Sequence, residues 1–479
     1  MPLKLVAAEV SLPRKPFGGP VRTTILVVTL GTVMALLAAC ASNGNKPAVA
    51  VRAPMVTHRV SALPLTLTAK KQLSPRLFEL TFHTTVLPGD TTKARVLLPA
   101  DYATSGKRYP VLYLMQPGLT DYSWWTNPAG GGADAETATA GLPLIVVMPD
   151  DGDAGFYTDW FNQGKFGPPE WETYGIDQLL PWVDENYRTI ADRSARATAG
   201  FSLGGHGAVS YAARHPDLFG ATASFSGSLN NSLTPGDGPL ASVAGLIYGH
   251  YFDQEVRWRG DNSWDLAGNL ANSDVSLYVG TAESFIKDEG VSFNERLQRL
   301  GIKHSWTLDP NGMHDSPSTQ RHLVEWLPHL MSYFATRHSL PTSFTYDSID
   351  PSYNVYDWTV TMKRPALEFS ALEVKGADRF TVAGSGTAQV VTGALYVPGR
   401  KYEVTVASPG NTAAAQSLRA TADGRLDLTV PLGPGNPRQQ YLGVPTNPPG
   451  TPGSNTGMPF YVRGDASKFT QVTVTITQS

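Results

Sequence analysis

Cysteine is almost absent from this chain of 479 residues, because Cys40 is the only one. A single cysteine excludes a disulfide framework within the chain and a site built from several thiolates. Charge is also scarce, since Asp, Glu, Lys and Arg make up 16% of the residues and the formal net charge is −3. That balance gives no reason to expect a nucleic-acid partner. With 41% hydrophobic residues, the composition indicates a globular protein of two or three domains.

One apolar run stands out near the start of the chain, ILVVTLGTVMALLAA at residues 25–39. It follows the basic residues Arg14, Lys15 and Arg22, and it is too short for a comfortable membrane span, so it predicts a secretory signal over residues 1–40. The ending Leu-Ala-Ala-Cys resembles a bacterial lipobox, which implies a lipidated Cys40 as the mature N-terminus. An ordinary cleaved signal or an uncleaved anchor is the alternative. We therefore expect an exported protein, either secreted or held at the outer face of the cell membrane through Cys40, with no free thiol left for catalysis.

Between residues 66 and 338, short apolar runs alternate with segments of helical pattern. Several runs, such as LIVVMP at 144–149, are continuously apolar, which is typical of strands buried on both faces of a largely parallel sheet. The alternation predicts a doubly wound α/β domain over residues 66–338, preceded by a tether over 41–65. The predicted strands are 77–84, 94–99, 111–115, 144–149, 195–201, 221–227, 275–280 and 304–310, and the predicted helices are 174–187, 203–215, 292–300 and 318–336.

Residues 339–479 show a different pattern, with short β-branched and aromatic segments separated by Gly, Pro, Asn and Asp. This pattern predicts an all-β, sandwich-like accessory domain. Its aromatic residues could face a cell-wall glycan, although aromatic side chains in a sandwich usually form its core. Glycan contact and simple packing against the preceding domain are both open. The aromatic residues in question are Tyr346, Tyr353, Tyr356, Trp358 and Phe460.

The stretch ATAGFSLGGHGA places Ser202 between glycines, where a predicted strand ends and a predicted helix begins. A strand–serine–helix turn of this kind exposes a serine hydroxyl as a nucleophile, and the glycines let the two elements approach closely. A plain turn in a parallel sheet is the alternative. The residues that would activate Ser202 decide between the two interpretations.

A serine hydroxyl becomes nucleophilic when a histidine takes its proton and a carboxylate orients that histidine. In this topology the acid and then the histidine follow the serine, each on a loop after a later strand. His314 follows the last predicted strand of the α/β region and is therefore the expected base. Glu283 follows the preceding strand closely and is the favoured acid, with Asp288 and Glu289 as alternatives on the same loop.

The reaction of an ester passes through an oxyanion, which backbone N–H groups near the nucleophile stabilise. The residue after the nucleophile, Leu203, supplies one N–H group from the start of the predicted helix. The loop after the strand at 111–115 offers the second, and Leu119 is the candidate there. No cofactor and no metal ion are expected for this chemistry.

Three segments, VVMPDDGDAGFYTDWFN at 146–162, PEWETYGIDQLLPWVDENY at 169–187 and GFSLGGHGA at 200–208, resemble the antigen 85 family of mycolyltransferases. That family belongs to a larger group of α/β-hydrolase esterases that includes S-formylglutathione hydrolases. The resemblance spans nearly all of the α/β region and implies an α/β-hydrolase fold. It also implies a catalytic set of Ser202, Glu283 and His314, with Leu119 and Leu203 as oxyanion donors.

The chain departs from the family at Thr120, where an arginine is expected, and at Ser316, where a tryptophan is expected. These departures weaken a trehalose site in particular. The accessory domain and the lipid anchor are not features of the secreted antigen 85 enzymes. The acyl chemistry is therefore better supported than a mycolate or trehalose specificity.

The sequence thus predicts an extracytoplasmic serine esterase or acyltransferase that works through an acyl-serine intermediate. The expected donor is an acyl ester or glycolipid of the cell envelope, and the expected acceptor is a sugar hydroxyl or water. The segment Phe156, Tyr157, Asp159 and Trp160 could bind the sugar; alternatively, the aromatic residues wall the cleft and Asp159 caps a turn. The competing functions are a plain carboxylesterase and a non-catalytic protein that binds glycan or matrix at the cell surface.

Overall fold

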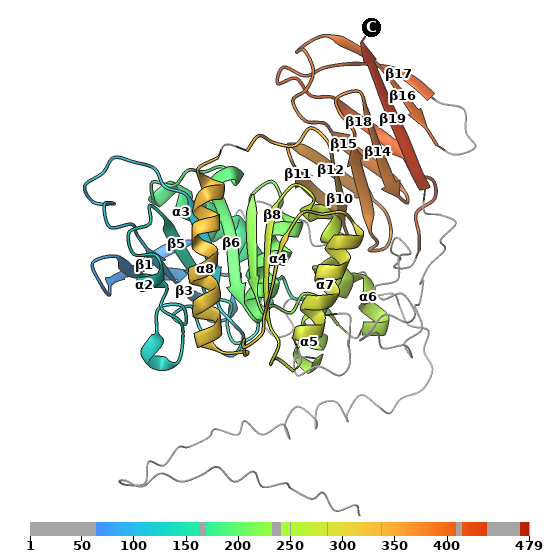
Figure 1. The fold of residues 1–479 in the computed structure, drawn as a ribbon. Coiled ribbons are helices and arrows are strands. Elements are labelled where there is room, and N and C mark those ends of the chain that lie inside the picture. The colour runs from blue at the N-terminus through green and yellow to red at the C-terminus, as the bar shows by residue number, and fades with distance from the viewer. Residues whose placement is uncertain are drawn as a thin grey trace, which may run out of the picture. The chain divides into compact units, whose positions relative to one another are not determined.

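The computed structural model describes residues 64–161, 169–231, 241–249, 251–284, 286–336, 338–408, 414–437 and 470–478 (Figure 1). All of them belong to one compact unit, residues 55–479. Cys40, the predicted signal and nearly all of the predicted tether lie outside the described residues, as does Phe460. Among the described helices, none combines the length and the apolar character that a membrane crossing requires.

A nine-stranded sheet forms the first half of the unit, with the strand order β1-β2-β3-β5-β4-β6-β7-β8-β9. The strands β1, β2, β3 and β5 pair antiparallel, and the pairs from β5 through β9 are parallel. The strands are β1 (Thr66–Gln72), β2 (Leu77–His83), β3 (Thr91–Leu97), β4 (Val111–Met115), β5 (Ile145–Pro149), β6 (Arg196–Phe201), β7 (Ala221–Phe225), β8 (Asp274–Gly280) and β9 (Ser305–Asp309).

Helices cover both faces of this sheet. They are α2 (Ala135–Ala138), α3 (Leu180–Asn186), α4 (Leu203–Arg214), α5 (Ala241–Tyr248), α6 (Tyr251–Gly260), α7 (Lys287–Arg299) and α8 (Ser316–Phe334), and α8 crosses one face in Figure 1. A π-helical segment, Thr173–Leu179, leads into α3, and short 3-10 helices cover Pro88–Asp90, Pro128–Gly130, Arg193–Ala195 and Ala267–Leu270.

Strand β4 shows why the apolar runs are continuous. Val111, Tyr113 and Met115 belong to the hydrophobic core that includes α4, while Leu112 and Leu114 belong to the core that includes α8. Because side chains alternate across a strand, a sheet covered on both faces needs apolar residues at every position. The predicted α/β-hydrolase fold, a mostly parallel sheet with helices on both faces, is confirmed.

The structure also contains elements that the sequence did not predict. Strand β1 has the sequence TLTAKKQ and is exposed at every position, so it has no apolar signal and lies at the edge of the sheet. The helices α5 and α6 were not predicted either. The predicted helix at 174–187 begins as a π-helix. Helix α7 begins at Lys287, earlier than the predicted residue 292, and the polar residues of its first turn explain why the apolar pattern missed that turn.

The second half of the unit is built from two antiparallel sheets, which confirms the predicted all-β architecture after residue 340. The order is β10-β13-β14-β19-β16-β17 in one sheet and β11-β12-β15-β18 in the other. The strands are β10 (Phe344–Ser348), β11 (Ser352–Val355), β12 (Trp358–Lys363), β13 (Ser370–Val374), β14 (Arg379–Gly384), β15 (Thr387–Val391), β16 (Lys401–Ala407), β17 (Ala414–Arg419), β18 (Asp427–Pro431) and β19 (Thr470–Gln478).

The aromatic residues considered for glycan contact form the core of this β region. Tyr346, Tyr353, Tyr356 and Trp358 are each at most 4% exposed and belong to its hydrophobic cluster. Buried rings cannot offer a face to a sugar. These four side chains therefore form the core of the β region, which is the alternative to glycan contact. The period-2 alternation of β10, β11 and β12 turns Tyr346, Tyr353 and Trp358 inward, while Tyr356 lies in the turn between β11 and β12 with a φ of +45°.

Candidate active site

Ser202 lies in a tight turn between β6 and α4. Its backbone has φ +56° and ψ −119°, a conformation that non-glycine residues rarely adopt. The turn depends on glycine, because a Cβ atom on Gly200 would lie 2.2 Å from the carbonyl oxygen of Gly204. A Cβ atom on Gly204 would lie 2.2 Å from the carbonyl oxygen of Met115. This strained, closely packed turn matches the geometry expected of a nucleophile and not of a plain loop.

The structure brings Ser202, His314 and Glu283 together. The Nε2 atom of His314 is 2.9 Å from the Oγ of Ser202, and its Nδ1 is 3.4 Å from Oε2 of Glu283. The second distance is long for a hydrogen bond, as is common before a substrate is bound. Each residue follows a parallel strand, β6, β8 or β9, so all three meet at the carboxyl edge of the sheet.

The carboxylate of Glu283 is buried and its two oxygens have separate partners. Oε1 accepts hydrogen bonds from Ser226 Oγ at 2.5 Å and from the Gly280 N–H at 2.9 Å. Oε2 faces His314. Ser226 was not predicted from the sequence, and its own φ of +52° in the turn after β7 aims the hydroxyl at Glu283.

The alternative acids have other surroundings. Glu289 lies on α7, where Oε2 accepts hydrogen bonds from Ser228 Oγ at 2.7 Å and from the Asn230 N–H at 3.1 Å. Burial raises the pKa of Glu289. Asp288 lies in the first turn of α7. Neither carboxylate makes a described hydrogen bond or ion pair with His314, whereas Glu283 does.

Apolar side chains lie next to His314. The ring of Phe201 lies 4.6 Å from the ring of His314, and Trp124 stacks on Phe201 at 5.4 Å. Leu119 is 79% exposed and Met313, the neighbour of His314, is 56% exposed. Exposed apolar side chains on the loop at 117–120 and directly before His314 suit a substrate with an apolar acyl group.

One of the two predicted oxyanion donors is in place and the other is engaged elsewhere. Leu203 is the first residue of α4, a position where the N–H group has no acceptor within the helix. The N–H group of Leu119, by contrast, donates a 2.6 Å hydrogen bond to the Asp153 carbonyl oxygen. The left-handed conformation of Leu119, with φ +60°, turns its amide toward Asp153. The predicted role of Leu119 therefore does not hold for this conformation.

The structure corrects the predicted sugar contacts of Phe156 and Tyr157. Both side chains are 2% exposed, and the hydroxyl of Tyr157 donates to the Gln116 carbonyl oxygen at 2.9 Å. Their φ angles of +58° and +53° fold this segment back on itself. Phe156 packs in a cluster with Leu203, directly behind the nucleophile. The two rings thus support the turn and are not available to a substrate.

Asp159 and Trp160 also have structural contacts. Asp159 accepts hydrogen bonds from the Thr173 N–H at 3.0 Å and from Thr173 Oγ1 at 2.6 Å. The indole N–H of the half-buried Trp160 donates to the Gly155 carbonyl oxygen at 3.2 Å. For Asp159 the alternative of a turn cap therefore describes the structure better than a sugar ligand.

A buried charge cluster behind the nucleophile helix was not predicted. His206, which is fully buried, has its Nε2 3.2 Å from Oδ2 of Asp261. Arg214, in the last turn of α4, pairs with Glu172 at 2.5 Å, with Asp261 at 3.4 Å and with Asp350 at 3.6 Å. Burial opposes the charge of Arg214, but these carboxylates raise its pKa well above the usual value. The cluster fixes α4 from both ends of its buried face.

Comparison with known proteins identifies the class. The model of an esterase family, described as "Putative esterase", matches residues 85–367, which is more than half of the chain. The chain belongs to this esterase family, whose members are carboxylic ester hydrolases.

Among curated proteins, Esterase Rv1288 and Esterase MT1326, both from Mycobacterium tuberculosis, are each 36% identical over 274 residues. This match covers 53% of the chain and 59% of each relative, so the chain spans less than two thirds of their length. The diacylglycerol acyltransferase/mycolyltransferase Ag85A of Mycobacterium gordonae is 28% identical over 45% of this chain and 70% of its own. The predicted resemblance to the antigen 85 family is confirmed.

Solved structures with a similar arrangement include a ferulic acid esterase, with a TM-score of 0.44 and 23% identity over 54% of this chain and 98% of its own. An S-formylglutathione hydrolase from Agrobacterium tumefaciens has a TM-score of 0.47 and 16% identity, over 56% of this chain and 99% of its own.

Proposed function

We propose that this protein is an exported serine esterase that cleaves acyl esters through an acyl-serine intermediate. The observation that carries the proposal is the position of His314, with Nε2 2.9 Å from Ser202 Oγ and Nδ1 facing Glu283. Membership of the esterase family supports the same reaction class.

In the proposed reaction, His314 takes the proton of Ser202 as the serine oxygen attacks the ester carbonyl. Glu283 orients the imidazole ring and stabilises the imidazolium that forms. The tetrahedral oxyanion accepts a hydrogen bond from the N–H group of Leu203 at the start of α4. His314 then gives its proton to the departing alcohol, and an activated water repeats the sequence to release the acid.

The second oxyanion donor is proposed to be Leu119 after its amide turns away from the Asp153 carbonyl oxygen. The present 2.6 Å hydrogen bond between the two would then be exchanged for one to the substrate. Such an exchange gives the loop at residues 117–120 a part in substrate binding, because the loop packs against the side chain of Leu203 at Gly118.

The proposed substrates are esters with an apolar acyl group, such as those of cell-envelope glycolipids or glycans. The exposed apolar surfaces of Leu119 and Met313 support the acyl part. The predicted export signal supports the envelope as the place of action.

Labelling with a fluorophosphonate tests this proposal. The probe should modify Ser202 alone in the wild-type protein, as mapped by mass spectrometry of peptides. Ser202→Ala should lose both labelling and turnover of a p-nitrophenyl ester while its circular dichroism stays that of the wild type. Ser332→Ala, which alters an exposed serine on α8, is the matched control. A wild-type protein that is neither labelled nor active would instead support the non-catalytic binding function.

Acyl transfer to a carbohydrate hydroxyl is the second candidate. It is favoured by the similarity to Ag85A, a diacylglycerol acyltransferase/mycolyltransferase. Transfer requires an acceptor aligned beside the acyl-enzyme in competition with water. Incubation with a short acyl ester and glycerol, glucose or trehalose, followed by mass spectrometry, should reveal acylated acceptor if transfer occurs. Free acid as the sole product at every acceptor concentration would leave the hydrolase.

A further inference from the structure

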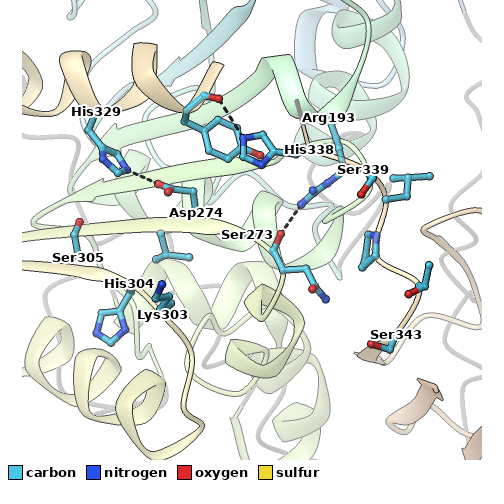
Figure 2. A pocket seen from close by; sticks show the side chains of 16 residues that line it. Arg193, Ser273, Asp274, Lys303, His304, Ser305, His329, His338, Ser339 and Ser343 are labelled. Carbon is cyan, nitrogen blue, oxygen red and sulfur yellow. Dashed lines mark hydrogen bonds and ion pairs between the residues drawn. The ribbon is translucent and has the colours of Figure 1, made fainter. Parts of the chain in front are cut away.

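A cavity of about 890 Å³ opens at the amino-terminal ends of β8 and β9. Its walls come from the 3-10 helix at Arg193–Ala195, from residues 272–275 and 303–305, from the last turns of α8 and from the segment 338–343 (Figure 2). Ser202, Glu283 and His314 follow the carboxyl ends of the parallel strands. The cavity and the candidate active site therefore lie at opposite edges of the sheet.

Arg193 gives this cavity a buried positive charge. The residue is 5% exposed; its Nε donates to the Pro216 carbonyl oxygen at 2.7 Å and its Nη2 donates to the Asn272 carbonyl oxygen at 2.9 Å. Within the described part of the chain, no carboxylate forms an ion pair with Arg193, and its Nη1 has no hydrogen-bond acceptor. A guanidinium held by neutral carbonyls, with a spare donor at a cavity wall, is suited to bind an anion.

The rest of the described cavity wall contains a second positively charged side chain, Lys303, and a single carboxylate, Asp274. Lys303 is exposed at the start of β9, opposite the Arg193 segment in Figure 2. Asp274 is the one carboxylate among the described lining residues, and it is already paired with His329 Nε2 at 2.7 Å. His338 is fixed by its hydrogen bond to the Tyr333 carbonyl oxygen, so the segment that follows it is anchored on α8.

Hydroxyl groups make up much of the rest of the wall. The Oγ of Ser273 is buried without a hydrogen-bond partner among the described residues, which is an unmet requirement in a protein interior. The cavity is far larger than one phosphate ion and falls in the range of small-molecule sites. The exposed lining hydroxyls belong to Ser305, Ser339, Thr342 and Ser343.

We propose that this cavity is a second binding site, for an anionic polyol that carries a phosphate or carboxylate group on a hydroxyl-bearing body. The anionic group binds to Arg193, the positive charge of Lys303 at the exposed rim attracts it, and the hydroxyls of the ligand bond to the serine and threonine side chains. Because the cavity is remote from Ser202, this site is independent of the esterase proposal.

Isothermal titration calorimetry of the full-length protein tests the site, with glycerol 3-phosphate and glucuronate as the two anionic probes. Glycerol and glucose are the neutral controls at equal ionic strength. At least one anionic probe should bind and neither neutral probe should, and added NaCl should weaken binding. The two anionic arms distinguish a phosphate ligand from a carboxylate ligand.

Two variants locate the binding. Lys303→Glu reverses the exposed charge and should weaken the binding anion by about tenfold or more, a loss of roughly 1.4 kcal/mol. Ser339→Trp should block the cavity, and Lys401→Glu, an exposed lysine on β16, should bind like the wild type. A circular dichroism spectrum and a melting temperature equal to those of the wild type would show that each variant is folded. Equal affinity in Lys303→Glu, Ser339→Trp and wild type, or no binding of either anion, would overturn the proposal.

Discussion

At the level of single residues, the carboxylate of Glu283 illustrates how a triad acid is held. One oxygen is bound by Ser226 and Gly280, so the other is directed at His314. Glu283→Gln keeps the shape but removes the negative charge that stabilises the imidazolium. We expect its kcat for a p-nitrophenyl ester to fall by roughly two to four orders of magnitude, as for other triad acids. Asp288→Asn is the control and should stay near wild type; a reversed result would assign the acid to Asp288.

The burial of Asp150 makes the stability of the folded protein depend on pH. Burial raises the pKa of this carboxyl from 3.8 to about 6, although the Gly152 N–H donates to it. A raised carboxyl pKa means that the folded state binds more protons than the unfolded state between these two values. Stability is therefore lost as the pH rises from about 4 to about 6, by up to about 3 kcal/mol.

Asp150→Asn removes this titration. The melting temperature of the variant, measured relative to that of the wild type, should rise between pH 4 and pH 7. Asp101→Asn, at a half-exposed carboxylate, serves as the control. A difference that is independent of pH, or that falls with pH, would rule out a raised pKa at Asp150.

At the level of elements, the sequence predicts those parts whose burial pattern is local. Strands such as β4 and β5 are apolar at every position, so the sheet could be inferred. Ser202, Glu283 and His314 each follow a strand that the sequence also predicted, so their order along the chain could be inferred as well. Edge strand β1 is exposed throughout and left no signal.

Contacts that depend on backbone conformation could not be inferred in the same way. Phe156, Tyr157 and Leu119 all have positive φ angles, which reverse the direction that an extended chain would give their side chains and amides. The alternation rule fails at such positions, so two aromatic residues expected at the surface are buried. The hydrogen bond from Leu119 to Asp153 arises from the same cause. Ser226 is likewise aimed at Glu283 by a turn that the residue types alone do not specify.

Helix α4 connects the nucleophile to the β region through the charge cluster. Ser202 precedes its first residue, while Arg214 in its last turn pairs with Asp350, which follows β10. The hydroxyl of Tyr346 on β10 also donates to the Arg214 carbonyl oxygen at 2.6 Å. Asp350→Asn should therefore destabilise the protein by about 2 kcal/mol, since it removes one of the three carboxylates that pair with the buried Arg214 while Glu172 and Asp261 remain.

Urea unfolding of Asp350→Asn, followed by tryptophan fluorescence, measures this loss. Asp423→Asn is the control, because it removes an exposed ion pair with Arg425 that solvent screens, so its unfolding midpoint should stay close to that of the wild type. Equal midpoints for the two variants would mean that the cluster does not stabilise α4.

At the scale of the whole molecule, the parallel sheet separates two chemistries. Its carboxyl edge gathers Ser202, Glu283 and His314 with apolar neighbours, which suits an acyl ester. Its amino edge gathers Arg193, Lys303 and several hydroxyls around the cavity, which suits a polar anion. Helix α8 touches both regions, because it begins just after His314 and ends at the cavity wall near Tyr333.

The attachment of the molecule to a membrane is predicted to depend on Cys40. The basic lead, the apolar run at 25–39 and the Leu-Ala-Ala-Cys ending predict lipidation of this cysteine, and a single diacylated residue adds enough buried CH₂ groups to anchor a protein. Wild-type protein expressed in a bacterium that processes lipoproteins should partition into the detergent phase of Triton X-114. Cys40→Ala should instead partition into the aqueous phase. Its ester turnover should stay unchanged, because the first strand of the α/β domain begins only at Thr66. Cys40→Ser provides a second variant without a thiol and should behave like Cys40→Ala. Wild-type protein recovered wholly from the medium would exclude the anchor and leave an ordinary cleaved signal.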